Sequence, residues 1–216
     1  MHNFTIQRNE FLSKEIQAFY HTDYVRMGNP GNPDCINILK NTYDSYPTSK
    51  LNNAVNELKS ALIEDWDSLV WDLQSPLTIC VVPRAKTKYS PNQLLFKSTI
   101  RAVIKQMNDE WKEGANSEDY FIDGTDYIIR NTNTKTTHLP STTPNYKNDG
   151  EAPYAGITKA TCRISNDVRG KNILLIDDIY TKGVNIDEDA IQALLDNGAN
   201  SVTFYAVGRT VKGGII

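Results

Sequence analysis

The chain has 216 residues, 39% of them hydrophobic and 23% charged, values typical of a folded globular domain and not of a disordered or fibrous chain. A formal net charge of −3 gives no general attraction for polyanions, so a nucleic-acid partner is not expected. The longest apolar runs are far shorter than the roughly 20 residues of a membrane helix, and the first residues become polar too soon for a secretory signal. We therefore expect a cytoplasmic protein without a membrane span.

The N-terminal part of the chain is predicted to be helical. Apolar residues recur at helical spacing between Phe11 and Phe19, and again, over about five turns, between Ser49 and Leu69. Residues 1–75 are accordingly expected to form a helical cap or hood, although the sequence does not fix where this segment ends.

Strands and helices alternate in residues 76–216. Apolar, β-branched runs predict strands at 77–82, 127–129, 172–176 and 201–207, and helical patterns predict helices at 91–111 and 184–197. Because parallel neighbours need crossover connections, this order predicts an α/β fold with a parallel sheet flanked by helices.

Residues 131–150 interrupt this alternation and consist almost entirely of polar residues, glycine and proline. Nothing in this stretch can anchor a core, so we predict a long loop. Loops of this length are usually lids or disordered segments. Lys135 lies on this loop and would close over a ligand if the loop were a lid.

The most informative stretch runs from Ile173 to Asn185. Asp177 and Asp178 stand at the carboxyl end of a predicted buried strand, and a turn containing Gly183 then opens a helix. In open α/β sheets, ligands bind at this edge, where loops leave the strand ends. The stretch therefore predicts a ligand site.

The residue types in this stretch suit a phosphorylated sugar. Backbone N–H groups of the turn and the helix dipole favour a phosphate dianion. Asp177 and Asp178 could accept hydrogen bonds from two vicinal hydroxyls, or hold Mg²⁺ through water. The residues predicted to line this site are Asp177, Asp178, Tyr180, Thr181, Lys182, Gly183, Val184 and Asn185. The alternative is that the acids only cap the helix and the glycine only makes a turn.

This stretch resembles the signature of type I phosphoribosyltransferases, in which two acids flanked by apolar residues precede a Thr-x-Gly phosphate loop. Thr181 and Gly183 match that loop. The family often has a threonine where Asn185 stands and a small residue where Lys182 stands. Between about residues 77 and 209 the chain looks most like the ComF-like and amidophosphoribosyltransferase-like branch, but it lacks the N-terminal cysteine zinc knuckle common in ComF proteins.

Further segments carry a looser resemblance to that branch. Residues 81–86 are similar to its first strand and pyrophosphate loop, residues 91–95 to the start of its next helix, and residues 130–138 to its flexible segment.

The resemblance implies the type I phosphoribosyltransferase fold and activity. Its substrates would be 5-phosphoribosyl-1-pyrophosphate (PRPP) and a small nitrogenous acceptor, with Mg²⁺ as cofactor and pyrophosphate as a product. Asp177 and Asp178 would be the catalytic residues and would bind the metal through water. The residues expected to hold the pyrophosphate are Arg84, Ala85, Lys86 and Lys135.

Several roles and functions stay open at this point. Lys88 could join the pyrophosphate site or belong to a solvated basic loop, His138 could be a base or simply exposed, and Tyr180 could stack near the ribose or fill the turn. Homodimers are the commonest assemblies of soluble proteins, so a homodimer is a possible assembly for this chain. The alternative functions are a non-catalytic sensor of PRPP or nucleotides that regulates a partner, and a ComF-like accessory in DNA uptake.

Overall fold

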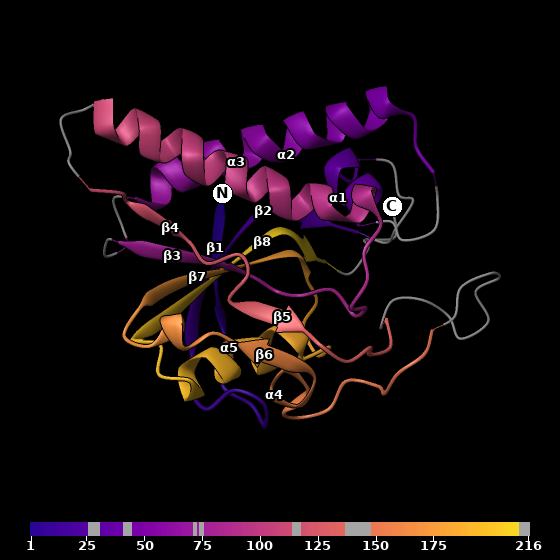
Figure 1. Ribbon diagram of the computed structural model, residues 1–216, viewed down its shortest axis with the longest axis vertical. Helices are drawn as coiled ribbons and strands as arrows, with labels where there is room; N and C mark the ends of the chain where they lie inside the picture. The colour runs from indigo at the N-terminus through magenta and orange to yellow at the C-terminus, as the bar shows by residue number, and fades with distance from the viewer. Residues whose placement is uncertain are drawn as a thin grey trace.

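A six-stranded, mostly parallel sheet forms the centre of the computed structural model, which describes residues 1–25, 31–40, 45–70, 73, 76–113, 118–136 and 148–211 (Figure 1). The strand order is β1-β2-β8-β7-β3-β4, and every neighbouring pair is parallel except β1 and β2. The strands of this sheet are β1 (His2–Ile6), β2 (Ile16–Tyr24), β3 (Leu77–Val81), β4 (Phe121–Asp123), β7 (Asn172–Tyr180) and β8 (Ser201–Thr210). The predicted α/β class with a parallel sheet and flanking helices is confirmed.

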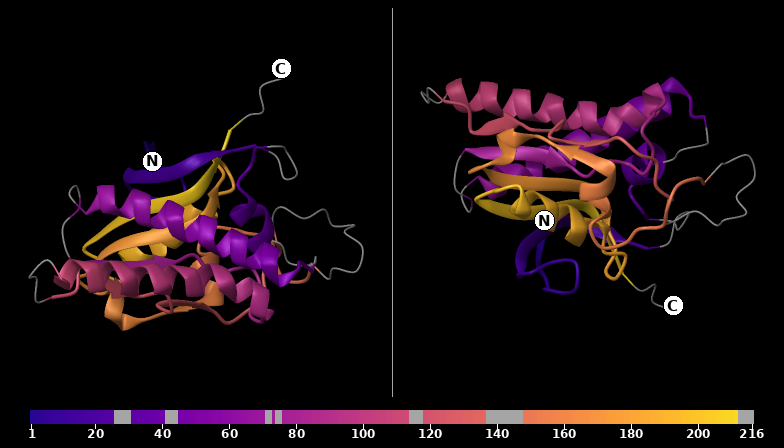
Figure 2. Two further views of the ribbon diagram at one scale, coloured as in Figure 1. Left: turned by 90° about the horizontal axis from the view of Figure 1, so that it is seen from above. Right: turned by 60° about the horizontal axis from the view of Figure 1, so that its bottom comes forward.

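Helices cover both faces of this sheet (Figures 1 and 2). On one face α1, α2 and α3 pack against one another, and on the other face α5 packs against β7 and β8 with the short α4 beside it. The helices are α1 (Asp34–Leu39), α2 (Thr48–Leu69), α3 (Pro91–Glu113), α4 (Ile157–Thr161) and α5 (Ile186–Asp196), with a short 3-10 helix at Asn166–Val168. A separate antiparallel pair, β5 (Ile128–Arg130) and β6 (Cys162–Ile164), contributes to the same apolar cluster as α5.

The two faces bury separate apolar clusters. On the α2 face, Leu62 and Trp66 are fully buried in one cluster with Leu174 of β7. On the α5 face, Ile191 is buried in a second cluster with Leu175. Since successive strand residues point to opposite faces, the unbroken apolar run of β7 supplies both clusters.

The helix predicted between Phe11 and Phe19 is wrong. The chain turns there between β1 and β2, and β2 pairs with β1 on one side and with β8 on the other. Ala18 faces the α5 cluster and Phe19 the α2 cluster, so both faces of β2 are buried and no alternation of polar residues marks it as a strand. Within the predicted N-terminal segment 1–75, the helix expected from Ser49 is confirmed as α2.

The other predicted elements are present with changed ends. The runs at 77–82 and 201–207 form β3 and β8, and the patterns at 91–111 and 184–197 form α3 and α5. The strand expected at 127–129 is β5, which pairs with β6 and not with the main sheet. The strand predicted to end at Ile176 continues as β7 to Tyr180, because its last residues still pair with β8.

Of the predicted loop at residues 131–150, the structure describes residues 131–136 and 148–150. These residues carry no helix, and an isolated parallel bridge joins Thr134 to Glu151. Elsewhere, Cys35, Cys80 and Cys162 are free thiols buried in the core. Over the described ranges, no helix has both the length and the apolar character that crossing a bilayer requires.

Candidate functional site

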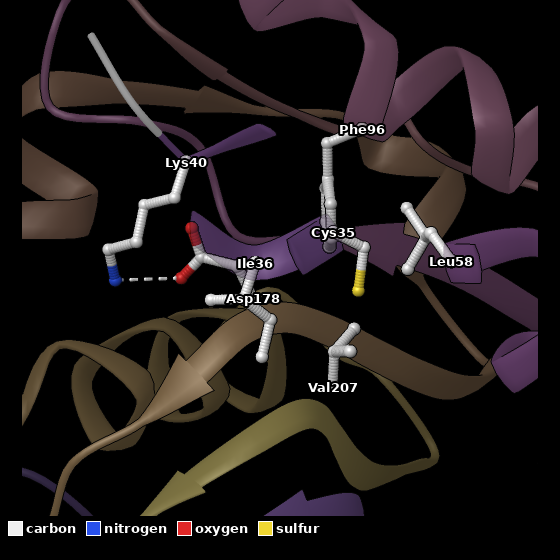
Figure 3. A pocket seen from close by; sticks show the side chains of 7 residues that line it. All are labelled: Cys35, Ile36, Lys40, Leu58, Phe96, Asp178 and Val207. Carbon is white, nitrogen blue, oxygen red and sulfur yellow. Dashed lines mark hydrogen bonds and ion pairs between the residues drawn. The ribbon is translucent and has the colours of Figure 1, made fainter. Parts of the chain in front are cut away.

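Asp177 and Asp178 lie near the carboxyl end of β7, inside the strand and not after it. Side chains of consecutive strand residues point to opposite faces of a sheet. Asp178 points toward α1, where its Oδ1 lies 3.0 Å from Nζ of Lys40 (Figure 3). Asp177 instead interacts with Asp187 of α5. The two adjacent acids therefore have different partners.

Lys40, which follows the last residue of α1, is a site residue that the sequence analysis missed. Its side chain is 27% exposed, and that of Asp178 is 19% exposed. Burial alone would lower the pKa of the Lys40 ammonium, but the charges of Asp178 and then Asp177 raise it above its ordinary value. No local pattern distinguishes this lysine, because only the packing of α1 brings it to Asp178.

A shallow pocket opens beside this ion pair (Figure 3). Its walls leave essentially no room for a water molecule, whereas small-molecule sites usually start at roughly 300 Å³. Cys35 lies in its wall, but burial raises the pKa of this thiol to about 12, so it is not an activated nucleophile. A ligand of Asp178 would therefore bind over the edge of the sheet and not inside the pocket.

Partly buried Asp177 and buried Asp187 form a carboxyl pair between β7 and the start of α5. Oδ1 of Asp177 accepts a hydrogen bond from the backbone N–H of Asp178 at 2.7 Å. Burial and, next in size, the charge of Asp178 raise the pKa of Asp177 to about 7. The hydrogen bond from Asp187 and the charge of Lys40 oppose this rise. Burial and Asp177 together raise the pKa of Asp187 well above its ordinary value. The pair therefore holds a proton near neutral pH, with Asp187 as the donor.

Tyr180 ends β7 with its ring in the core. The ring packs against those of Phe4 and Phe204, with centroid separations of 5.0 and 5.7 Å. Its hydroxyl donates to Oε1 of Glu188 at 2.9 Å, and Glu188 is itself buried. Of the two roles considered for this side chain, the structure places it under the turn as a packing group.

The turn between Thr181 and Asn185 connects β7 to α5. The N–H of Val184 donates to the carbonyl of Thr181 at 3.2 Å and closes the turn. Gly183 has a φ of 87°, and a Cβ atom added to it would meet no atom within 4 Å, so the backbone is open to an approaching ligand. Asn185 also has a positive φ, 63°, and its Nδ2 donates to the carbonyl of Gly183 at 3.2 Å. The side chain of Lys182 is exposed.

Residues from both ends of the chain hold this turn in place. Nδ2 of Asn9, in the β1–β2 connection, donates to Oδ1 of Asn185 at 3.1 Å. Oδ1 of Asn9 accepts two backbone N–H groups of its own loop at 2.8 and 3.0 Å, which fixes its orientation. The hydroxyls of Thr181 and Thr210 lie 2.7 Å apart. The sequence analysis missed Asn9, since nothing local links it to the turn.

The first turn of α5 adds backbone donors to this edge of the sheet. The first N–H groups of a helix have no intrahelical acceptor, and the helix dipole favours an anion there. Three acids also occupy this turn. Asp187 lies against Asp177, Glu188 accepts from Tyr180 through Oε1, and Asp189 accepts two N–H groups at the start of α4 at 2.6 and 2.7 Å. Oδ1 of Asp187 and Oε2 of Glu188 are buried without a hydrogen-bond partner among the described residues. An external anion would therefore meet the helix start from the open side at Gly183.

The loop after β3 lies beside the acids because β3 pairs with β7. The N–H of Val82 donates to the carbonyl of Ile176 at 2.9 Å. Two residues later, the Arg84 guanidinium donates to the carbonyl of Lys40 at 3.1 Å and to that of Leu39. Arg84 thus lies at the predicted edge of the sheet, where it caps the carboxyl end of α1.

Ala85 and Lys86 connect this loop to the segments on either side of residues 137–147. The carbonyl of Ala85 accepts the N–H of Thr134 at 2.8 Å. Nζ of Lys86 donates to the carbonyl of Thr134 at 2.9 Å and pairs with the carboxylate of Asp149 at 2.7 Å. The Lys86 ammonium therefore already has partners in the ligand-free protein.

Three further candidates, two lysines and the possible base His138, lie on or near the predicted long loop. The side chain of Lys135 is exposed, and its N–H donates to the carbonyl of Glu151 at 2.9 Å, next to the contact between Thr134 and Ala85. Lys88 is also exposed. His138 lies outside the described residues.

Among the described residues, no three His, Cys, Asp or Glu side chains are grouped so that they could hold a metal ion. Mg²⁺ usually takes one or two carboxylates and completes its shell with water and substrate phosphates. The partly exposed carboxylate of Asp178 fits that requirement. Asp177 fits it less well, because its carboxyl is engaged with Asp187.

Comparisons with known proteins supply no relative that could identify this site. A scan against protein-family models finds no match, and a search of curated proteins finds none at a significant level. Inferences about function therefore depend on the residues and geometry described above.

Proposed function

We propose that this chain is a Mg²⁺-dependent phosphoribosyltransferase of the type I fold, which uses PRPP and a small nitrogenous acceptor and releases pyrophosphate. The observation that carries the proposal is the order of features at one sheet edge. Two acids lie near the carboxyl end of a parallel strand with a buried core, and an open glycine turn and a helix start follow the end of that strand. This is the edge at which open α/β sheets bind ligands.

The turn would bind the 5-phosphate of the donor. Its backbone is open at Gly183, and the N–H groups at the start of α5 point to the same edge. Asn9 and Asn185 hold the turn in shape before any ligand arrives, which lowers the entropic cost of binding. Lys182, exposed on the turn, would add positive charge near the phosphate.

The acids would bind the ribose and the metal. Asp178 is partly exposed and would accept hydrogen bonds from ribose hydroxyls. Asp177 would act at the same edge, and its proton exchange with Asp187 would set the charge of the site near neutral pH. Mg²⁺, held through water by these acids, would neutralise part of the charge of the pyrophosphate.

The loop after β3 would hold the pyrophosphate. Arg84, Ala85 and Lys86 lie beside the acids, and Lys135 is connected to them through Thr134. In the reaction, the bond from C1′ of the ribose to pyrophosphate oxygen breaks and a bond from C1′ to the acceptor nitrogen forms. The leaving oxygen keeps the bonding electrons, and the nitrogen loses its proton to water or a nearby base. Positioning and charge neutralisation would supply most of the catalysis.

The proposal is tested by measuring pyrophosphate release from PRPP and Mg²⁺ with a panel of nitrogenous acceptors. The double variant Asp177→Asn/Asp178→Asn is expected to lose at least about 100-fold in rate, roughly 2.7 kcal/mol, because it removes both carboxylates from the reacting sugar. Asp109→Asn, an exposed aspartate on α3 that pairs with Lys105, is the matched control and should keep the wild-type rate. Unchanged turnover in a folded double variant would show that the assignment is wrong.

A non-catalytic sensor is the second candidate, and the internal pairing of the site's charges favours it. Lys86 pairs with Asp149, and Asp178 pairs with Lys40, so a ligand must exchange these contacts for its own. Such an exchange could be read by a partner protein without any reaction. Tight binding of PRPP with no pyrophosphate release across the acceptor panel would favour this candidate.

A further inference from the structure

We propose that Lys40 is a donor-binding residue whose ammonium leaves Asp178 and takes an anionic oxygen of the donor when the donor and Mg²⁺ engage Asp178. This inference rests on the proposed function, because it assigns one more residue to the same site. It adds α1 to a site that otherwise consists of β7, β3 and the start of α5.

The geometry of the ion pair suits such an exchange. Nζ of Lys40 lies 3.0 Å from Oδ1 of Asp178, and the two side chains are 27% and 19% exposed. The pair lines the shallow pocket beside α1 and β7, and its partial exposure to solvent, not the pocket, is what lets a ligand reach it (Figure 3). Asp178 is held by the sheet, whereas Lys40 has a flexible four-carbon stem. Lys40 is therefore the member of the pair that can change partner.

Arg84 positions Lys40 through the backbone of α1. The last carbonyls of a helix have no intrahelical donor, and Arg84 satisfies those of Leu39 and Lys40. The N–H of Lys40 also donates to the carbonyl of Ile36 at 3.0 Å. The end of α1 is therefore held by its own cap bond and by Arg84, so the loop after β3 helps to position the backbone of Lys40.

The charges around the acids give Lys40 a role beside those proposed for Arg84 and Lys86. The donor brings several negative charges, which need cations close to the sheet edge. Lys86 is already paired with Asp149, and Arg84 is engaged with α1. The partner of Lys40 is the acid that the ribose or the metal would take over, so donor binding itself releases Lys40.

A purely structural ion pair is the competing explanation. In that case Lys40 would only anchor α1 to β7, and replacing it would change stability without changing ligand affinity. Titrations that measure binding of PRPP with Mg²⁺, and of Mn²⁺ alone, separate the two explanations. If Lys40 only anchors α1, replacing it in a folded protein should leave both affinities unchanged.

The experiment compares the wild type with Lys40→Met, Lys40→Arg and a control, Lys105→Met, which removes an exposed lysine paired with Asp109 on α3. Lys40→Met should weaken PRPP binding at least about tenfold, because a charge-assisted contact is lost. Lys40→Arg should stay within about threefold of the wild type, since the charge is kept. Lys40→Met should bind Mn²⁺ alone about threefold more tightly, because the ammonium no longer competes for Asp178. The control should change neither affinity.

The outcomes distinguish this inference from the proposed function. If the wild type binds PRPP and a folded Lys40→Met binds it equally well, the role of Lys40 is overturned and the proposed function stands. If the wild type itself binds no PRPP, the proposed function fails and the role of Lys40 fails with it. Should Lys40→Met not fold, Lys40→Gln provides the same test, because it keeps a hydrogen-bond donor for Asp178 and removes the charge.

Discussion

The two faces of the sheet treat their buried acids in opposite ways. On the face covered by α1 and α2, two buried or partly buried acids meet basic groups. Asp178 pairs with Lys40, and Asp65 of α2 lies 3.0 Å from Nδ1 of His21 and accepts the hydroxyl of Tyr205 at 2.8 Å. Charges on this face are therefore compensated by side chains that come from other elements.

The face covered by α5 has acids without cations. Asp177, Asp187 and Glu188 form no ion pair with any described residue. Asp177 and Asp187 hold a proton in place of a cationic partner, since burial raises the pKa values of both carboxyls. Glu188 instead accepts a hydrogen bond from Tyr180.

Asp177 and Asp178 show that residue type and neighbouring position do not settle the charge of a side chain. Strand β7 places the carboxyl of Asp178 on the face where Lys40 lies, and the carboxyl of Asp177 on the face where Asp187 lies. On both faces stability should fall as pH rises, because the pKa values of Asp177 and His21 are both raised in the folded protein. The substitutions should act in opposite directions, since removing Asp177 should stabilise the protein near neutral pH and removing His21 should destabilise it at acidic pH. Three variants test or refine this difference.

The largest effect is expected for Asp177→Asn on the α5 face. A raised carboxyl pKa means that the folded state binds more protons than the unfolded state, so stability falls as pH rises from about 4 to about 7. The variant should remove this loss, which we expect to be on the order of 2 kcal/mol. Urea unfolding of wild type and variant at about pH 5 and about pH 7.5 measures it. An equal difference between the two proteins at both pH values would contradict the shared-proton assignment.

A smaller effect of opposite sign is expected for His21→Gln on the α2 face. The hydrogen bond with Asp65 raises the pKa of His21 in spite of burial, while the α-amino group of Met1 opposes the shift and Glu64 supports it. The pair therefore stabilises the fold below the unfolded pKa of about 6.5 and loses this contribution as pH rises through the higher folded value.

We expect His21→Gln to cost about 1 kcal/mol at about pH 5.5 and less at about pH 8.5. Thermal unfolding at the two pH values measures both costs. A cost that does not shrink at the higher pH would mean that packing, and not charge, explains the contribution of His21.

The smallest effect is expected for Asn185→Gly, at the edge that both faces share. Glycine accepts the positive φ of this position without strain, so loss of the contact with Asn9 should change stability by only about 0.5 kcal/mol. Asn185→Ala should cost about 1 kcal/mol more, because alanine is strained in the left-handed region. Denaturant unfolding of the two variants measures this difference. Equal stabilities would show that the backbone of the turn relaxes.

The elements predicted correctly from the sequence are those with strong local signals. Unbroken apolar runs gave β3, β7 and β8, and helical periodicity gave α2, α3 and α5. The N-terminal hairpin was missed because β2 owes its conformation to pairing with β8 at the other end of the chain. The end of β7 was placed too early for the same reason, since Asp177 resembles a turn residue until its pairing with Ala206 is known.

The candidate site divides in the same way. Asp177, Asp178 and the glycine turn lie within one short stretch, so the sequence by itself determined that two acids precede an anion-binding turn. Only the tertiary structure decided that the acids point to opposite faces, that Lys40 compensates one and Asp187 shares a proton with the other, and that Asn9 holds the turn. Local chain order specifies which groups are neighbours in sequence, but their charges and partners depend on which distant elements pack against them.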